Sequence, residues 1–126
     1  MNGINLDQLC ARYGWQIAEK LNLDIPKNAE NHITKSLGVL QEDGVYAFFL
    51  YQSSRGDREI KGAVELSNLA KQLLAEAGIL SFKDTNDPLA AVRDHLANNL
   101  DQLLLAKRLL EQALIYARYH AKAMEK

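Results

Sequence analysis

The sequence predicts an all-α protein, a single-domain bundle of about six helices over residues 1–126. The two Pro and seven Gly are few, and the aliphatic residues are mostly Leu and Ala, a bias that favours helix over strand. Apolar residues recur at helical spacing along most of the chain. With 48% hydrophobic and 25% charged residues, the composition is typical of a soluble globular protein with one core.

The first helix is expected to begin at Asn5, because Asn is a good N-cap and Gln8 three residues later completes a capping pattern. Trp15 lies off the apolar stripe of this helix. It is interpreted either as the edge of a broad core face or as an anchor for a partner protein. The stripe itself contains Leu6, Leu9, Cys10, Tyr13, Ile17 and Leu21.

The centre of the chain is the segment from Val45 to Tyr51, seven consecutive apolar or aromatic residues. Asp43-Gly44 precedes it and is expected to end a second helix. The segment could be a buried strand or a buried helix, but the only other strand candidate is the short Ile79 to Phe82. We therefore predict an aromatic-rich central helix that the other helices cover on every side.

The rest of the chain predicts three further helices. One spans about Arg58 to Ala77 and ends at Gly78, and the next opens at Asp87-Pro88 as N-cap and first helical residue. Two successive Asn residues, Asn98 and Asn99, favour a break. The last and longest helix is expected from about Leu100 to Met124.

Several function classes find no support in the sequence. One cysteine, Cys10, permits no internal disulfide and fits a reducing compartment. No signal-peptide pattern is visible, and the longest apolar run is too short to span a membrane. The sequence therefore predicts a cytoplasmic protein without membrane association.

The residues that usually carry chemistry are scattered. His32, His95 and His120 fall in separate helices without a metal-ligand spacing, and we interpret them as surface or half-buried residues. No Gly-rich phosphate loop and no GxSxG sequence is present. Cys10 lies on an apolar stripe and is interpreted as an inert core residue. We expect no metal, no cofactor and no catalytic activity.

Basic residues form a stripe on the last helix. Lys107, Arg118 and Lys122 fall with Glu111 within about 60° of one another at about 100° per residue. The stripe is either a solvated face that complements the helix dipole or a surface that contacts nucleic-acid phosphates. A second cluster is diluted by Asp57 and Glu59. The RNA-phosphate candidates are Lys107, Arg108, Arg118, Lys122, Arg55, Arg58 and Lys61.

Three segments resemble the small all-helical subunit of type III (Cmr-type) CRISPR–Cas effector complexes. They are Cys10-Ala11-Arg12-Tyr13 in the first helix, the junction from Leu37 to Leu50, and the closing Tyr-Ala-Arg-Tyr-His-Ala-Lys-Ala of residues 116–123. The junction matches through an apolar helix, a Gly and an Ala-Phe pair. The chain departs from the family at Asp43, where Asn is usual, and at Ser36-Leu37, where Leu-Pro is usual.

The resemblance implies a non-catalytic structural subunit. Its partners would be other CRISPR–Cas effector subunits, further copies of itself stacked head to tail, and guide and target RNA. Contact with RNA would be electrostatic and independent of sequence. The alternative is a helical protein–protein adaptor without a role in RNA binding, which would dock through Trp15 or the first helix.

Overall fold

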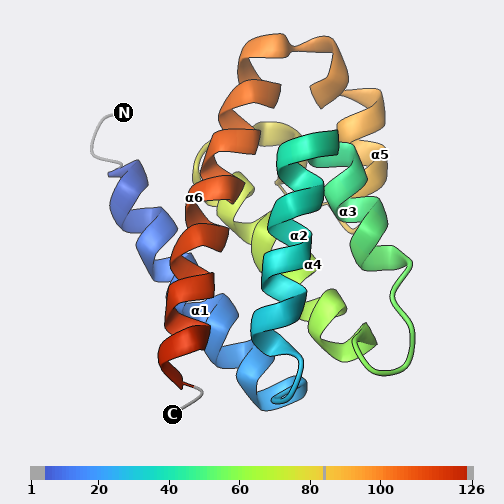
Figure 1. Cartoon of the computed structure of the whole chain (residues 1–126). Coiled ribbons are helices and arrows are strands. Elements are labelled where there is room, and N and C mark those ends of the chain that lie inside the picture. The colour runs from blue at the N-terminus through green and yellow to red at the C-terminus, as the bar shows by residue number, and fades with distance from the viewer. Residues whose placement is uncertain (1–4, 84, 125–126) are drawn as a thin grey trace.

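The computed structural model describes residues 5–83 and 85–124, and over these residues the protein is all-helical (Figure 1). The predicted fold class, with a long C-terminal helix, is therefore confirmed. Six α-helices and two short 3₁₀ helices follow in order: α1 Leu6–Asp24, α2 Ala29–Asp43, α3 Val45–Ser53, α4 Ile60–Glu76, η1 Leu80–Phe82, α5 Pro88–Asp94, η2 Leu96–Asn98 and α6 Leu100–Met124.

Local capping sets several helix ends where the sequence predicts them. The Asn5 side chain accepts a hydrogen bond from the backbone N–H of Gln8, and Asp87 accepts one from Ala90 at the start of α5. Asn99 does the same for Gln102, so the predicted break at Asn98–Asn99 becomes the entry to α6. These side chains satisfy backbone donors that have no partner within the helix.

The junction between α2 and α3 depends on Gly44. Its φ of 96° lies in a region that side-chain-bearing residues rarely adopt, which lets α3 begin directly after α2 ends. The central segment is helical, as predicted, and buries Phe48 and Phe49. The prediction that it is covered on every side is wrong, because Tyr46 is 38% and Leu50 is 49% exposed.

The core lies where α1, α2, α4 and α6 meet. Three aromatic side chains, Phe48, Phe49 and Phe82, fill the part of the core beneath α3. The rings of Phe48 and Phe49 pack edge to face with centroids 5.1 Å apart, and Phe49 stacks on Phe82 of η1 at 5.8 Å. Offset and edge-to-face pairs of this kind add to the burial of apolar area. Cys10 is buried in the same core, as predicted, and burial raises the pKa of its thiol to about 11.

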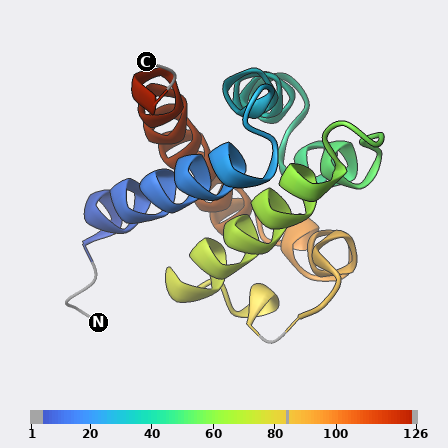
Figure 2. The ribbon, with the colours of Figure 1, turned by 90° about the horizontal axis from the view of Figure 1, so that it is seen from below.

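The long helix α1 lies between α6 and α4 (Figure 2). It approaches α6 closely at Gly14: a Cβ atom built there would lie 2.8 Å from the Ala113 carbonyl oxygen and 2.6 Å from the Tyr116 Cβ. Only a residue without a side chain allows this approach.

Different elements form the two ends of the bundle (Figure 1). The α2–α3 junction, α5, η2 and the start of α6 lie at the upper end in this view, and the end of α1 and the start of α4 lie at the lower end. The helix α6 runs between them. None of the helices in the described ranges combines the length and the apolar character that a membrane span requires.

Candidate nucleic-acid interface

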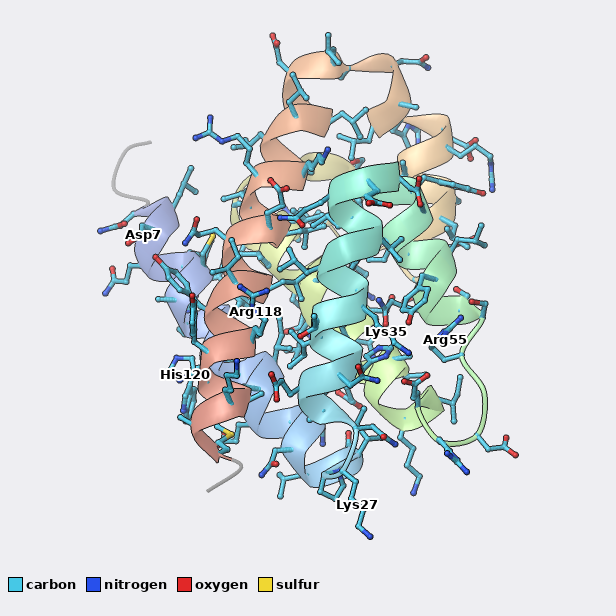
Figure 3. All side chains as sticks on the ribbon, viewed as in Figure 1. Asp7, Lys27, Lys35, Arg55, Arg118 and His120 are labelled. Carbon is cyan, nitrogen blue, oxygen red and sulfur yellow. The ribbon has the colours of Figure 1, made fainter. Side chains whose placement is uncertain are left out.

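The basic stripe of α6 borders α2. The Lys107 ammonium donates a hydrogen bond to the Gln41 carbonyl oxygen at 3.2 Å, and the Lys122 ammonium lies 3.9 Å from a Glu30 carboxylate oxygen. Arg118 lies between these two positions along α6, on the side that Figure 3 turns toward the reader. The structure therefore brings three of the predicted cations into one row.

An exposed aromatic residue accompanies this row. Tyr119 is 62% exposed, and the guanidinium carbon of Arg118 lies 5.5 Å from the centre of its ring. An exposed aromatic ring beside a cation is the combination that binds single-stranded nucleic acid through stacking and charge. Tyr119 is not one of the predicted RNA-phosphate residues, although it belongs to the Tyr-Ala-Arg-Tyr segment that carries the family resemblance.

Arg108 does not join the row. It is exposed, but it lines a hollow between α6 and α1 together with Asp7 and Cys10. Helical geometry explains the difference, because Arg108 follows Lys107 by one residue and therefore points about 100° away from it.

The second predicted cluster is divided between two environments. Arg58 and Lys61 are exposed, whereas Arg55 is half-buried with its guanidinium 3.8 Å from the centre of the Tyr51 ring. Glu59 lies 3.7 Å from Arg55 and partly neutralises it. Figure 3 places Lys35 of α2 on the same side as Arg55 and Arg118. As a single charge on the polar face of α2, Lys35 gave no signal of its own in the sequence.

A buried polar network joins α2 to α3 on the inner side of the Arg55–Glu59 pair. His32 Nε2 and the Gln52 side-chain oxygen are 2.7 Å apart, and the Gln52 amide nitrogen donates to the Ser36 hydroxyl at 2.9 Å. His32 and Ser36 are fully buried, and Gln52 is only 2% exposed. The interpretation of all three histidines as surface or half-buried is therefore wrong for His32, while His95 and His120 are exposed.

The second ring nitrogen of His32 has no hydrogen-bond partner. Nδ1 lies 3.7 Å from a Glu59 carboxylate oxygen, too far for a hydrogen bond. Burial lowers the pKa of His32, the hydrogen bond that its Nε2–H donates to the Gln52 side-chain oxygen and the charge of Glu59 raise it, and the charge of Arg55 lowers it. Neighbouring groups thus shift the pKa of the His32 imidazole in opposite directions.

Trp15 lies outside the core and lines a surface groove of about 630 Å³ between α1 and α4. It is 46% exposed, so it is not a buried residue of the core face, and its role as an anchor for a partner protein stays a prediction. The Glu76 carboxylate forms an ion pair with Arg12 and accepts a hydrogen bond from the Tyr13 hydroxyl at 2.7 Å. These bonds lower the pKa of Glu76, and the pKa of Tyr13 rises to about 12, chiefly through burial.

The two ends of the bundle each expose an apolar surface. At the upper end, Leu100 and Leu104 are 66% and 51% exposed, and Leu104 lines a cavity of about 330 Å³ together with Val45, Val92 and Leu103. We call the exposed side chains of Tyr46, Leu100 and Leu104 the junction patch. At the lower end, Leu23, Ile60 and Val64 are 71%, 38% and 48% exposed; Leu23 lines one hollow between α1 and α4, and Ile60 and Val64 line the next. We call these three side chains the α1–α4 patch.

Comparisons with models of protein families, with curated proteins and with solved structures found no match to this chain. Within residues 5–83 and 85–124, no group of three or more His, Cys, Asp or Glu side chains is placed to hold a metal ion.

Proposed function

We propose that this protein is a non-catalytic structural subunit of a type III CRISPR–Cas ribonucleoprotein effector complex. In this role its copies stack head to tail, contact other subunits of the complex and bind guide and target RNA through charge. One observation carries the proposal: apolar patches lie at opposite ends of the bundle, and a row of cations runs along α6 between them.

The apolar patches support the stacking. Exposed apolar groups that lie together commonly mark protein–protein contact surfaces. Because the junction patch and the α1–α4 patch consist of different residues, contact between them joins the upper end of one copy to the lower end of the next. Such a head-to-tail contact is heterologous, and it repeats along an axis.

The cations support the RNA contact. From Lys107 to Lys122 is 15 residues, or about 22 Å of helix at about 1.5 Å per residue. A nucleic-acid strand carries roughly six phosphates over that length at about 3.4 Å each. Stacking along the axis of α6 would repeat the row from copy to copy and form a basic track without base-specific contacts.

Substitution of the exposed leucines tests whether copies of the protein stack. Leu104→Asp places a charge in the junction patch and is expected to keep the protein monomeric, whereas the wild-type average mass should rise with concentration in analytical ultracentrifugation. Leu50→Asp is the matched control, because Leu50 is 49% exposed against 51% for Leu104 but lies further along α3. It should associate like the wild type.

Mixing variants tests the head-to-tail geometry itself. Leu23→Asp is expected to block association through the α1–α4 patch, as Leu104→Asp does through the junction patch. Each variant keeps the patch that the other lacks, so an equimolar mixture should form a 1:1 dimer and no larger species. A mixture that remains monomeric would rule out pairing of these two patches.

The basic row has a separate test in RNA binding. The double variant Arg118→Glu/Lys122→Glu should bind a short single-stranded RNA more weakly than the wild type at low salt. Loss of two phosphate contacts should also lower the slope of log affinity against log salt by about 1.4. Filter binding or fluorescence anisotropy over a salt series measures both quantities.

The control for this test reverses two charges elsewhere, Lys71→Glu/Lys83→Glu, on α4 and on the segment after η1. It changes the net charge equally and should leave most of the affinity in place. If both double variants bind RNA as the wild type does, α6 is not the RNA-binding surface.

A helical protein–protein adaptor is the second candidate, and the groove at Trp15 favours it. A half-exposed Trp in a groove of about 630 Å³ has the form of an energetically dominant interface residue. An adaptor without an RNA role would show no RNA affinity at any salt concentration, and Trp15→Ala would reduce capture of its protein partner.

A further inference from the structure

The guanidinium of Arg55 lies over the aromatic ring of Tyr51 and is partly exposed to solvent. Its Nε donates to the Tyr51 carbonyl oxygen at 3.1 Å and one Nη donates to the Ser54 hydroxyl at 3.2 Å, so the guanidinium is fixed over the ring. A guanidinium has five N–H donors, and these two bonds occupy two of them. The side chain is 26% exposed, which leaves donors available for a phosphate group.

Glu59 lies between Arg55 and the buried histidine. One of its carboxylate oxygens is 3.7 Å from Arg55 Nη1, and the other is 3.7 Å from His32 Nδ1. Neither distance is that of a hydrogen bond. The carboxylate is therefore shared between two basic groups, of which the buried one has an unpartnered nitrogen.

Resting on the proposed function, we infer that Arg55 binds an RNA phosphate and that this binding is coupled, through Glu59, to the uptake of one proton by His32 at Nδ1. The proton comes from solvent, and no covalent bond other than the new N–H is made. Once protonated, Nδ1 becomes a donor directed at the Glu59 carboxylate, which also removes the unpartnered buried acceptor.

The direction of the coupling follows from the charges around His32. Arg55 and Glu59 face it from the loop between α3 and α4, and Tyr51 stacks on it from α3. Lys122 of α6 pairs with Glu30 and is not among the groups that act on His32. Arg55 lowers the pKa of His32 and Glu59 raises it. A phosphate neutralises Arg55 and competes with Glu59 for it, so both changes raise the pKa of His32 toward its ordinary value. Binding therefore takes up a proton, and by linkage RNA binds more tightly as the pH falls.

The first experiment requires no RNA. NMR titration of the His32 imidazole should give a higher pKa in Arg55→Gln than in the wild type, and a lower one in Glu59→Gln. Arg58→Gln is the matched control, since Arg58 is an exposed arginine of the same loop, and it should leave the titration unchanged. An unchanged His32 titration in both Arg55→Gln and Glu59→Gln overturns the coupling.

The second experiment uses a short oligouridine RNA in calorimetry with buffers of different ionisation enthalpy, which reports the protons taken up on binding. It is done in a His120→Gln background, which removes the exposed imidazole of α6. We expect proton uptake and several-fold tighter binding at about pH 5.5 than at about pH 7.5. Both effects should be lost in Arg55→Gln and in Glu59→Gln, a conservative change at a partly exposed site.

The outcomes separate this inference from the proposed function. RNA binding without proton uptake, or with uptake that persists in Arg55→Gln, overturns the coupling and leaves the RNA-binding role in place. Absence of RNA binding at low salt and at both pH values overturns the proposed RNA role, and the inference with it.

Discussion

Replacement of Gly14 by alanine is expected to destabilise the protein by about 2–3 kcal/mol, because the added methyl group has no space between α1 and α6. It would lie 2.8 Å from the Ala113 carbonyl oxygen and 3.1 Å from the Ala117 nitrogen, and both are backbone atoms of α6. The two helices must separate to admit it. Thermal unfolding followed by circular dichroism should show a midpoint lower by roughly 10 °C for a chain of this size.

Two other glycines supply controls for this prediction. Gly38 lies in α2 with nothing within 4 Å of a built Cβ, so Gly38→Ala should stabilise the protein by about 0.5–1 kcal/mol through helix propensity alone. At Gly62 the obstruction is the flexible end of Ile25, and a smaller loss is expected than at Gly14. Equal stability of Gly14→Ala and Gly38→Ala would contradict the close approach of α1 and α6.

Truncation of Gln52 to alanine is expected to cost about 2–4 kcal/mol. Gln52 connects two fully buried groups, His32 and Ser36, and without it both lose their partner in a site without access to water. Each buried polar group left unpaired costs about 1–3 kcal/mol, and the space vacated by the side chain adds to the loss. Urea unfolding of the two proteins measures the difference.

The matched control is Gln72→Ala, which makes the same change at an exposed position of α4. It should alter the free energy of unfolding by no more than about 0.5 kcal/mol. If Gln52→Ala is as mild as this control, the network does not stabilise the contact between α2 and α3.

Helix ends were predictable because their signals are local. Asn5 and Asp87 cap helices with their own side chains, and Gly44 supplies a backbone conformation that few other residues adopt. The helical state of Val45 to Tyr51 was also predictable, from the lack of strand partners elsewhere in the chain. Its incomplete burial was not, because exposure of Leu50 depends on which helices pack against α3.

The candidate sites were predictable only in part. Helical spacing aligned Lys107, Arg118 and Lys122 correctly, but their neighbours Gln41 and Glu30 belong to α2 and come near only in the folded chain. His32 had a signal that was missed. It lies four residues before Ser36 and one before Ile33, within the buried face of α2, whereas its partner Gln52 lies 20 residues away on α3. No local pattern predicts that pairing.

The unlike character of the two end patches has a consequence for stoichiometry. In an open stack, a junction patch that pairs with an α1–α4 patch leaves one unpaired patch of each kind at the ends, however long the stack becomes. Under the proposed stacking, the contact between the two patches therefore sets no limit on the number of copies. If the proposed stacking holds, the number of copies must be fixed from outside, by the length of the bound RNA or by subunits that cap the terminal patches.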